Sequence, residues 1–314
     1  MTGVRFGFLQ EPTQLTFSAG CIEPLNDHAS IVAKLLGHER AYAGWLYPPL
    51  KAVCPDAREE KTPPEVSVSF ALPATHRLVM GEGHPSDDAA NFFIALFGML
   101  KGLRLQRDTW QHFYRCPLQP RSLCDFLATD REIIEALNLG AEFWMALPDD
   151  AARRLAFGAI HWHLFAQLYD HEFERFNAQY MALDTCWKLA TRLHPRLAKG
   201  KLSHAKRVQE LGKELQIPLP EWALVSDELH ASTLSTRRNE LIHEALYGDQ
   251  PVGFAYPDDG RVERELTCFV ARLVLRLLGV ENEYTGSSST TRQRFGFSFP
   301  AQGLQSLQPE CHKG

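Results

Sequence analysis

The sequence has no long apolar run. Its longest unbroken apolar stretch covers residues 92–100, whereas a membrane-spanning helix needs about 20 apolar residues. The N-terminal residues lack the apolar segment of a secretory signal. The seven cysteines are scattered and contain no Cys-x-x-Cys pair, a pattern typical of a reducing compartment in which thiols pack as small apolar groups. We therefore expect a cytoplasmic protein with no membrane partner.

The sequence also has no excess of positive charge. Lys and Arg number 33 and Asp and Glu 38, which gives a net charge of −5. This balance excludes a generally cationic nucleic-acid-binding chain but allows a local basic patch. Glycine (21) and proline (19) are present at ordinary levels in the 314 residues, which excludes a collagenous or wholly disordered chain. The length predicts about two domains.

Residues 1–121 carry strand signals. Val4, Phe6 and Phe8 alternate with Arg5 and Gly7, and residues 66–72 alternate in the same way. A period of two places one apolar face on a sheet. Ser86, followed by two aspartates, predicts the start of a buried helix over residues 89–103. We expect a mixed α/β accessory domain over residues 1–121.

Helical periodicity dominates from residue 122 onward. The predicted helices cover residues 122–138, 150–193 with a break near 169–171, 201–216, 221–247 as one helix or two, and 263–278. The fold class is therefore α+β, with an all-α bundle over residues 122–284.

Residues 285–314 are rich in Ser, Thr, Gln and Gly, which predicts a flexible tail. Within this tail, Arg294-Phe295-Gly296-Phe297 repeats the residues found at positions 5–8. Either the repeat is a coincidence or the tail returns to pair with the N-terminal sheet.

The most informative stretch covers residues 235–247. Arg238 and His243 are five residues apart, which on an α-helix is about 140° of rotation and 7.5 Å of rise. They would therefore not converge on one point but would line a shallow groove, with Asn239 on the same face as His243. A histidine beside a guanidinium suits acid–base chemistry on a phosphodiester, in which the guanidinium holds the phosphate.

The string Arg238-Asn239-x3-His243, late in a helical bundle, resembles the R-N-x3-H form of the R-x4–6-H motif of HEPN domains. The segment from Phe173 to Lys188, in which Asp184 follows an Ala-Leu pair, resembles the second long helix of the ApeA-like HEPN group. The resemblance covers about residues 150–280, somewhat under half of the chain. No motif of this kind is present in the N-terminal part.

The resemblance implies a fold and an activity. HEPN domains are helical bundles that usually pair, with their motif helices facing each other. Many are metal-independent endoribonucleases of toxin–antitoxin, abortive-infection and CRISPR systems, and others bind nucleotides or partner proteins. On this basis Arg238 and His243 would be catalytic, Asn239 would orient His243 or the phosphate, and Asp184 would orient Arg238. Attack by an RNA 2′-OH would leave a cyclic 2′,3′-phosphate and a 5′-OH, without cofactor or metal.

A basic segment gives independent support for a polyanionic partner. Between Lys188 and Lys213 there are eight basic residues and one acidic residue, Glu210. Such a segment can follow a phosphate backbone. The alternative is that it is only a solvated connector between helices. The predicted RNA contacts are Arg196, Lys199, Lys201, Lys206 and Arg207. Because aromatic residues are sparse in the segment, base stacking is not predicted there.

His161 and His163 do not form a metal site, because residues two apart on a helix point about 200° from each other. The sequence therefore predicts a cytoplasmic, homodimeric RNA endonuclease. It would act on single-stranded or tRNA-like RNA in antiphage defence or as a toxin, with a cognate regulator protein. The alternatives are a non-catalytic HEPN module that binds nucleotide, RNA or a partner protein, and a helical scaffold.

Overall fold

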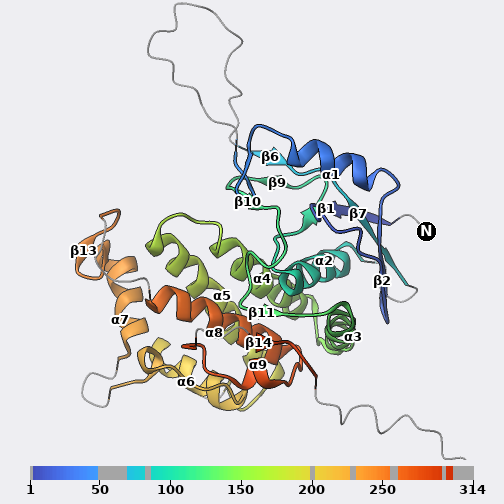
Figure 1. The fold of residues 1–314 in the computed structure, drawn as a ribbon. Coiled ribbons are helices and arrows are strands. Elements are labelled where there is room, and N and C mark those ends of the chain that lie inside the picture. The colour runs from blue at the N-terminus through green and yellow to red at the C-terminus, as the bar shows by residue number, and fades with distance from the viewer. Residues whose placement is uncertain are drawn as a thin grey trace, which may run out of the picture.

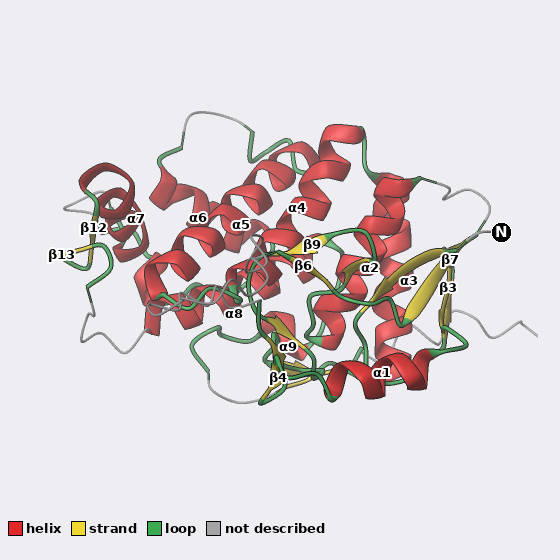
Figure 2. Ribbon diagram, turned by 90° about the horizontal axis from the view of Figure 1, so that it is seen from above, coloured by secondary structure: helices red, strands yellow, loops and turns green. Residues whose placement is uncertain are grey.

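A computed structural model describes residues 3–48, 69–81, 86–198, 202–226, 231–254, 261–291 and 295–299. Small sheets and two helices occupy the N-terminal part, and helices dominate the rest (Figures 1 and 2). The predicted α+β order is confirmed, and the prediction of a HEPN bundle stays a prediction. No helix within the described ranges is both long enough and apolar enough to cross a membrane.

The N-terminal sheet has five antiparallel strands in the order β2-β3-β7-β1-β8. The alternation predicted at the N-terminus forms β1, in which Phe6 is buried and Arg5 is exposed. The strands are β1 (Val4–Gly7), β2 (Leu15–Phe17), β3 (Gly20–Pro24), β7 (His76–Met80) and β8 (Gln106–Arg107). Of the strand predicted over residues 66–72, residues 66–68 lie outside the described ranges, and β6 (Phe70–Ala71) pairs with β9 (Gln111–His112).

The predicted buried helix is α2 (Asp87–Lys101). Ser86 caps it by accepting a hydrogen bond from the Ala89 N–H at 3.1 Å, and Gly102 ends it with a left-handed φ of 64°. This helix packs against β7 and β8 of the sheet and against the helices over residues 130–146 and 150–166. The other N-terminal elements are α1 (His28–Leu36) and a three-stranded sheet of β4 (Ala41–Tyr42), β5 (Trp45–Leu46) and β10 (Cys116–Pro117).

Five long helices follow. They are α3 (Asp130–Ala146), α4 (Asp150–Ala166), α5 (Glu172–Leu193), α6 (His204–Glu214) and α8 (Arg261–Leu277). The helix predicted over residues 122–138 is wrong in its position, because Thr129 caps its start and it covers residues 130–146. The other four follow the predicted periodicity. The predicted break near residues 169–171 is confirmed, since α4 ends before it and α5 begins after it. Helices α4 and α5 lie side by side, and α8 packs against α5 (Figure 1). One apolar core includes residues from the N-terminal sheet, α2 and these helices.

The helix or helix pair predicted over residues 221–247 is three short elements. A 3₁₀ turn covers Glu221–Ala223, α7 covers Thr233–Asn239, and a π-helical turn covers Glu240–Glu244. A hairpin of β12 (Leu246–Tyr247) and β13 (Gln250–Pro251) follows.

The first part of the C-terminal tail packs onto the protein. After α9 (Glu283–Gly286), β14 (Phe295–Gly296) runs parallel to β11 (Phe126–Leu127), and Phe297 is fully buried. The repeated residues therefore pair with β11 and not with the five-stranded sheet. Buried Arg272 holds this region together, because its guanidinium donates to Asp125, Tyr284 and Ser287.

Candidate functional site

Arg238 and His243 meet on an exposed face at the end of α7. The Arg238 Nη1 atom lies 3.0 Å from His243 Nε2 and donates to Asn239 Oδ1 at 2.9 Å. The expectation that the two side chains would point about 140° apart is wrong. They form a direct hydrogen bond, and Asn239 joins it from the guanidinium side.

The π-helical turn explains why the two residues meet. In a π-helix the backbone hydrogen bond joins residues five apart, and the Ala245 N–H bonds to the Glu240 carbonyl in this pattern. Residues five apart then lie above one another instead of on different faces. Ala245 takes the left-handed conformation with a φ of 56° and directs the chain into the β12–β13 hairpin.

The neighbouring arginine fixes α7 to the core. Arg237 Nη1 lies 2.8 Å from Glu263 Oε1 on α8, and both side chains are almost completely buried. Tyr247 donates a hydrogen bond to the same carboxylate, and the Arg237 guanidinium lies 5.3 Å from the centre of the Tyr247 ring. Consecutive helical residues point about 100° apart, so Arg237 faces inward while Arg238 faces solvent.

Two further titratable side chains lie within the electrostatic reach of Arg238. The Tyr180 hydroxyl on α5 and His204 Nδ1 on α6 are 2.9 Å apart. Burial lowers the pKa of His204, and the positive charges of Arg207 and Arg238 lower it further. Burial raises the pKa of Tyr180 to about 12, although Arg238 opposes the shift. Sequence reasoning missed both residues, although Tyr180 lies one turn before Asp184 on the same face of α5.

Asp184 does not orient Arg238. Its carboxylate lies 2.9 Å from Lys188 Nζ and 3.4 Å from Arg207 Nη1. The Arg207 guanidinium also rests over the Trp187 ring, at 5.9 Å from the ring centre. Because α6 brings Arg207 to this carboxylate, Asp184 pairs with Arg207 and not with the predicted Arg238.

Two of the predicted RNA contacts form ion pairs within the protein. Arg196 pairs with Glu214 at 2.8 Å, Arg207 pairs with Asp184, and Lys206 is exposed. Lys199 and Lys201 lie outside the described residues. Ion pairs at a protein surface contribute only about 0–1 kcal/mol, so these arginines can exchange a carboxylate for a phosphate.

His161 and His163 lie outside this site. Burial lowers the pKa of each to about 4. His163 Nδ1 lies 3.3 Å from Gln179 Oε1, so its ring belongs to the core of the bundle. Within the described ranges, no three His, Cys, Asp or Glu side chains gather in a way that could hold a metal ion.

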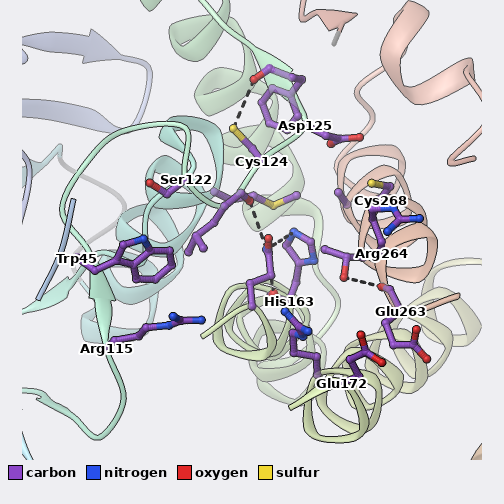
Figure 3. A pocket seen from close by; sticks show the side chains of 17 residues that line it. Trp45, Arg115, Ser122, Cys124, Asp125, His163, Glu172, Glu263, Arg264 and Cys268 are labelled. Carbon is purple, nitrogen blue, oxygen red and sulfur yellow. Dashed lines mark hydrogen bonds between the residues drawn. The ribbon is translucent and has the colours of Figure 1, made fainter. Parts of the chain in front are cut away.

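A cavity of about 470 Å³ lies between β5, the loop before β11, and helices α4, α5 and α8 (Figure 3). Some of its polar groups already have partners. Arg115 pairs with Asp170 at 2.8 Å and lies over Trp45, and Gln167 donates to the Leu123 carbonyl at 3.3 Å. Glu263, which anchors α7, lies on its wall (Figure 3). The cavity therefore shares Glu263 with the ion pair that anchors α7, the helix that carries Arg238.

Comparisons with protein-family models, curated proteins and solved structures found no match to this chain.

Proposed function

We propose that the protein is a metal-independent endoribonuclease whose active centre is the Arg238–His243 pair. The observation that carries the proposal is the distance of 3.0 Å between Arg238 Nη1 and His243 Nε2, where His243 is exposed and Arg238 is half-buried. One phosphate placed at this point could accept a hydrogen bond from the guanidinium while its ribose faces the imidazole.

The geometry suggests how the groups would divide the reaction. Since Arg238 donates to His243 Nε2, that nitrogen carries a lone pair and can act as a base. His243 would take the proton of the 2′-OH, and the 2′-oxygen would attack the adjacent phosphorus. The P–O5′ bond would break, giving a cyclic 2′,3′-phosphate and a 5′-OH. Arg238 would stabilise the negative charge that develops on the phosphate oxygens.

The leaving 5′-oxygen needs a proton. In the proposed homodimer, His243 of a second copy would supply it. Exposed apolar side chains near the motif support a contact of this kind, since Ile242 and Phe254 are 51% and 72% exposed. Apolar side chains of this size at the surface are typical of interaction sites when they gather in one region.

A non-catalytic module that binds RNA through the same pair is the second candidate. The position of Asp184 favours it, because Asp184 pairs with Arg207, and among the described residues Arg238 is held by Asn239 and His243. Such a module would retain RNA without cutting it.

The test is cleavage of a labelled single-stranded RNA by the purified protein in EDTA. We expect products that end in a cyclic 2′,3′-phosphate. His243→Ala and Arg238→Ala should each abolish cleavage, whereas His171→Ala, at another exposed histidine, should cut like the wild type. A substrate with 2′-O-methyl groups should stay intact. Retention of RNA without cleavage would favour the second candidate, and cleavage by both active-site variants would overturn the proposal.

A further inference from the structure

An open groove of about 560 Å³ lies between α4 and α5. Cationic, aromatic and small side chains share its walls. Those that matter for its chemistry are Arg154, Gly158 and Trp162 on α4, and Thr185, Lys188 and Arg192 on α5. None of them belongs to the Arg238–His243 pair.

Gly158 gives the groove its floor. A Cβ atom at this position would lie 3.5 Å from Thr185 Cγ2, so the two helices approach closely and no α4 side chain fills the space between them. Trp162 lies four residues further along α4 and is half-buried. Its ring packs against Phe165 with 5.8 Å between centroids, which fixes the indole at the groove wall.

A row of side chains along α5 runs from the groove to the Tyr180–His204 pair. Tyr180, Asp184, Lys188 and Arg192 are spaced four residues apart, so each follows the last by about 6 Å of rise and about 40° of rotation. Asp184 pairs with Lys188 in the groove and with Arg207 on α6. The next residue in this stripe, Tyr180, hydrogen-bonds to His204, whose pKa Arg238 lowers.

The charge of the groove favours an anionic ligand. Arg154 is exposed, and Lys188 and Arg192 have side chains that are 60% and 42% exposed. The facing acids are Asp184, which pairs with Lys188, and Asp149, which pairs with Arg192 at 2.8 Å. Pairs this exposed are weak and exchange readily with phosphate.

We propose that this groove binds the single-stranded RNA substrate and leads it to Arg238 and His243. Arg154, Lys188 and Arg192 would contact successive phosphates, and an unpaired base would stack on Trp162. An aromatic side chain inside a basic groove is the combination that single-stranded nucleic acids require, whereas paired bases in a duplex are not free to stack on it. The proposal rests on the function proposed above in assigning RNA as the substrate.

Binding can be measured without cleavage in the His243→Ala background. The probe is a 12-nucleotide RNA without self-complementarity, labelled with fluorescein at its 5′ end and followed by anisotropy. Adding Trp162→Ala should weaken binding by about 5- to 150-fold, the range measured when a stacking aromatic is removed. Trp162→Phe should restore most of the affinity. Arg154→Gln should lower the slope of log affinity against log salt by about 0.7, as expected for one lost phosphate contact on a single strand.

The control is Lys34→Gln on α1, an exposed cation outside the groove, which should leave affinity and slope unchanged. Unchanged binding by both the Trp162→Ala and Arg154→Gln proteins would overturn the proposal, as would equal affinity for a perfect RNA duplex. The two proposals fail separately. Loss of binding in the groove variants of a protein that never cuts RNA would reject only the nuclease. Full cleavage by groove variants of an active enzyme would reject only the groove.

Discussion

Arg237 and Arg238 are adjacent in sequence, yet they have opposite environments. The first is buried against Glu263, and the second reaches solvent beside His243. A buried ion pair is costly to break from one side, because the remaining charge stays in a medium of low dielectric constant. The exposed arginine thus takes its position from the buried one.

This arrangement predicts the effect of Glu263→Gln. The substitution removes the negative charge that lies 2.8 Å from the buried Arg237 guanidinium, so the free energy of unfolding should fall by about 3 kcal/mol. Urea denaturation measures the change. Glu135→Gln removes a surface pair with Arg131 and should cost less than about 1 kcal/mol. Equal losses in the two variants would show that the buried pair does not hold α7.

The sequence predicts which residues belong to the site better than it predicts which residues contact each other. Arg238, Asn239 and His243 were predicted to belong to one site, and the structure brings them together. Asp184 was assigned to the wrong arginine, and His204 was missed. Both depend on how α6 packs against α5, which no local spacing encodes.

At the scale of elements, the groove between α4 and α5 depends on a helical glycine. Glycine in a helix is less stable than alanine by about 0.5–1 kcal/mol, and a Cβ at Gly158 makes only an ordinary contact with Thr185. Gly158→Ala should therefore raise the free energy of unfolding by about that amount while making the groove shallower.

Gly140 on α3 is the matched comparison. A Cβ there would lie 2.6 Å from Leu96 Cδ2, inside the core. Gly140→Ala should therefore lower stability by about 1–3 kcal/mol, because extra volume in a packed core forces side chains to move. Urea denaturation of both variants measures the difference. The same sign of change at both positions would contradict the account of the groove floor.

Most of the long helices could be predicted because their caps and apolar faces are local, although α3 begins at Asp130 and not at the predicted residue 122. Ser86 and Asp149 each cap the helix that the sequence places after them. The π-helical turn could not be predicted, since an α-helix and a π-helix share the same apolar residues and differ by one hydrogen-bond step. The geometry of the candidate site therefore depends on the π-helical turn, which the sequence pattern does not distinguish from an α-helix.

At the scale of the whole molecule, buried neutral histidines lie in both the N-terminal and the helical parts. Burial lowers the pKa of His76 and His163 to about 4 and that of His112 to about 3. In the unfolded chain each has a pKa near 6.5. Below pH 6.5 these histidines bind protons in the unfolded chain but stay neutral in the folded protein. The stability present above pH 6.5 is therefore lost as the pH falls toward 4.

The expected loss between pH 7.5 and 5.5 is about 1.4 kcal/mol for each of these histidines. Urea denaturation at the two pH values measures the free energy of unfolding. Burial also lowers the pKa of His161 to about 4, so four such histidines contribute to the drop. Replacing His163 with Gln, whichever way it changes stability at pH 7.5, should therefore reduce the drop by about one quarter. A free energy of unfolding that is constant over this range would contradict the neutral burial of these side chains.

The order of sheet and helices could be predicted from the sequence, but the placement of the tail could not. Phe295 and Phe297 repeat the residues at Phe6 and Phe8, yet they pack beside Phe126 and Tyr284 instead of extending the sheet of β1. Two alternating segments with equal apolar faces can each pair with any free edge, so the pairing is decided by the tertiary fold.

The most direct test of the account is an RNA cleavage assay in EDTA with the wild-type protein and the His243→Ala variant side by side. The account predicts wild-type products that end in a cyclic 2′,3′-phosphate and an intact substrate with the variant. Equal cleavage by the two proteins, or an intact substrate with both, would contradict it.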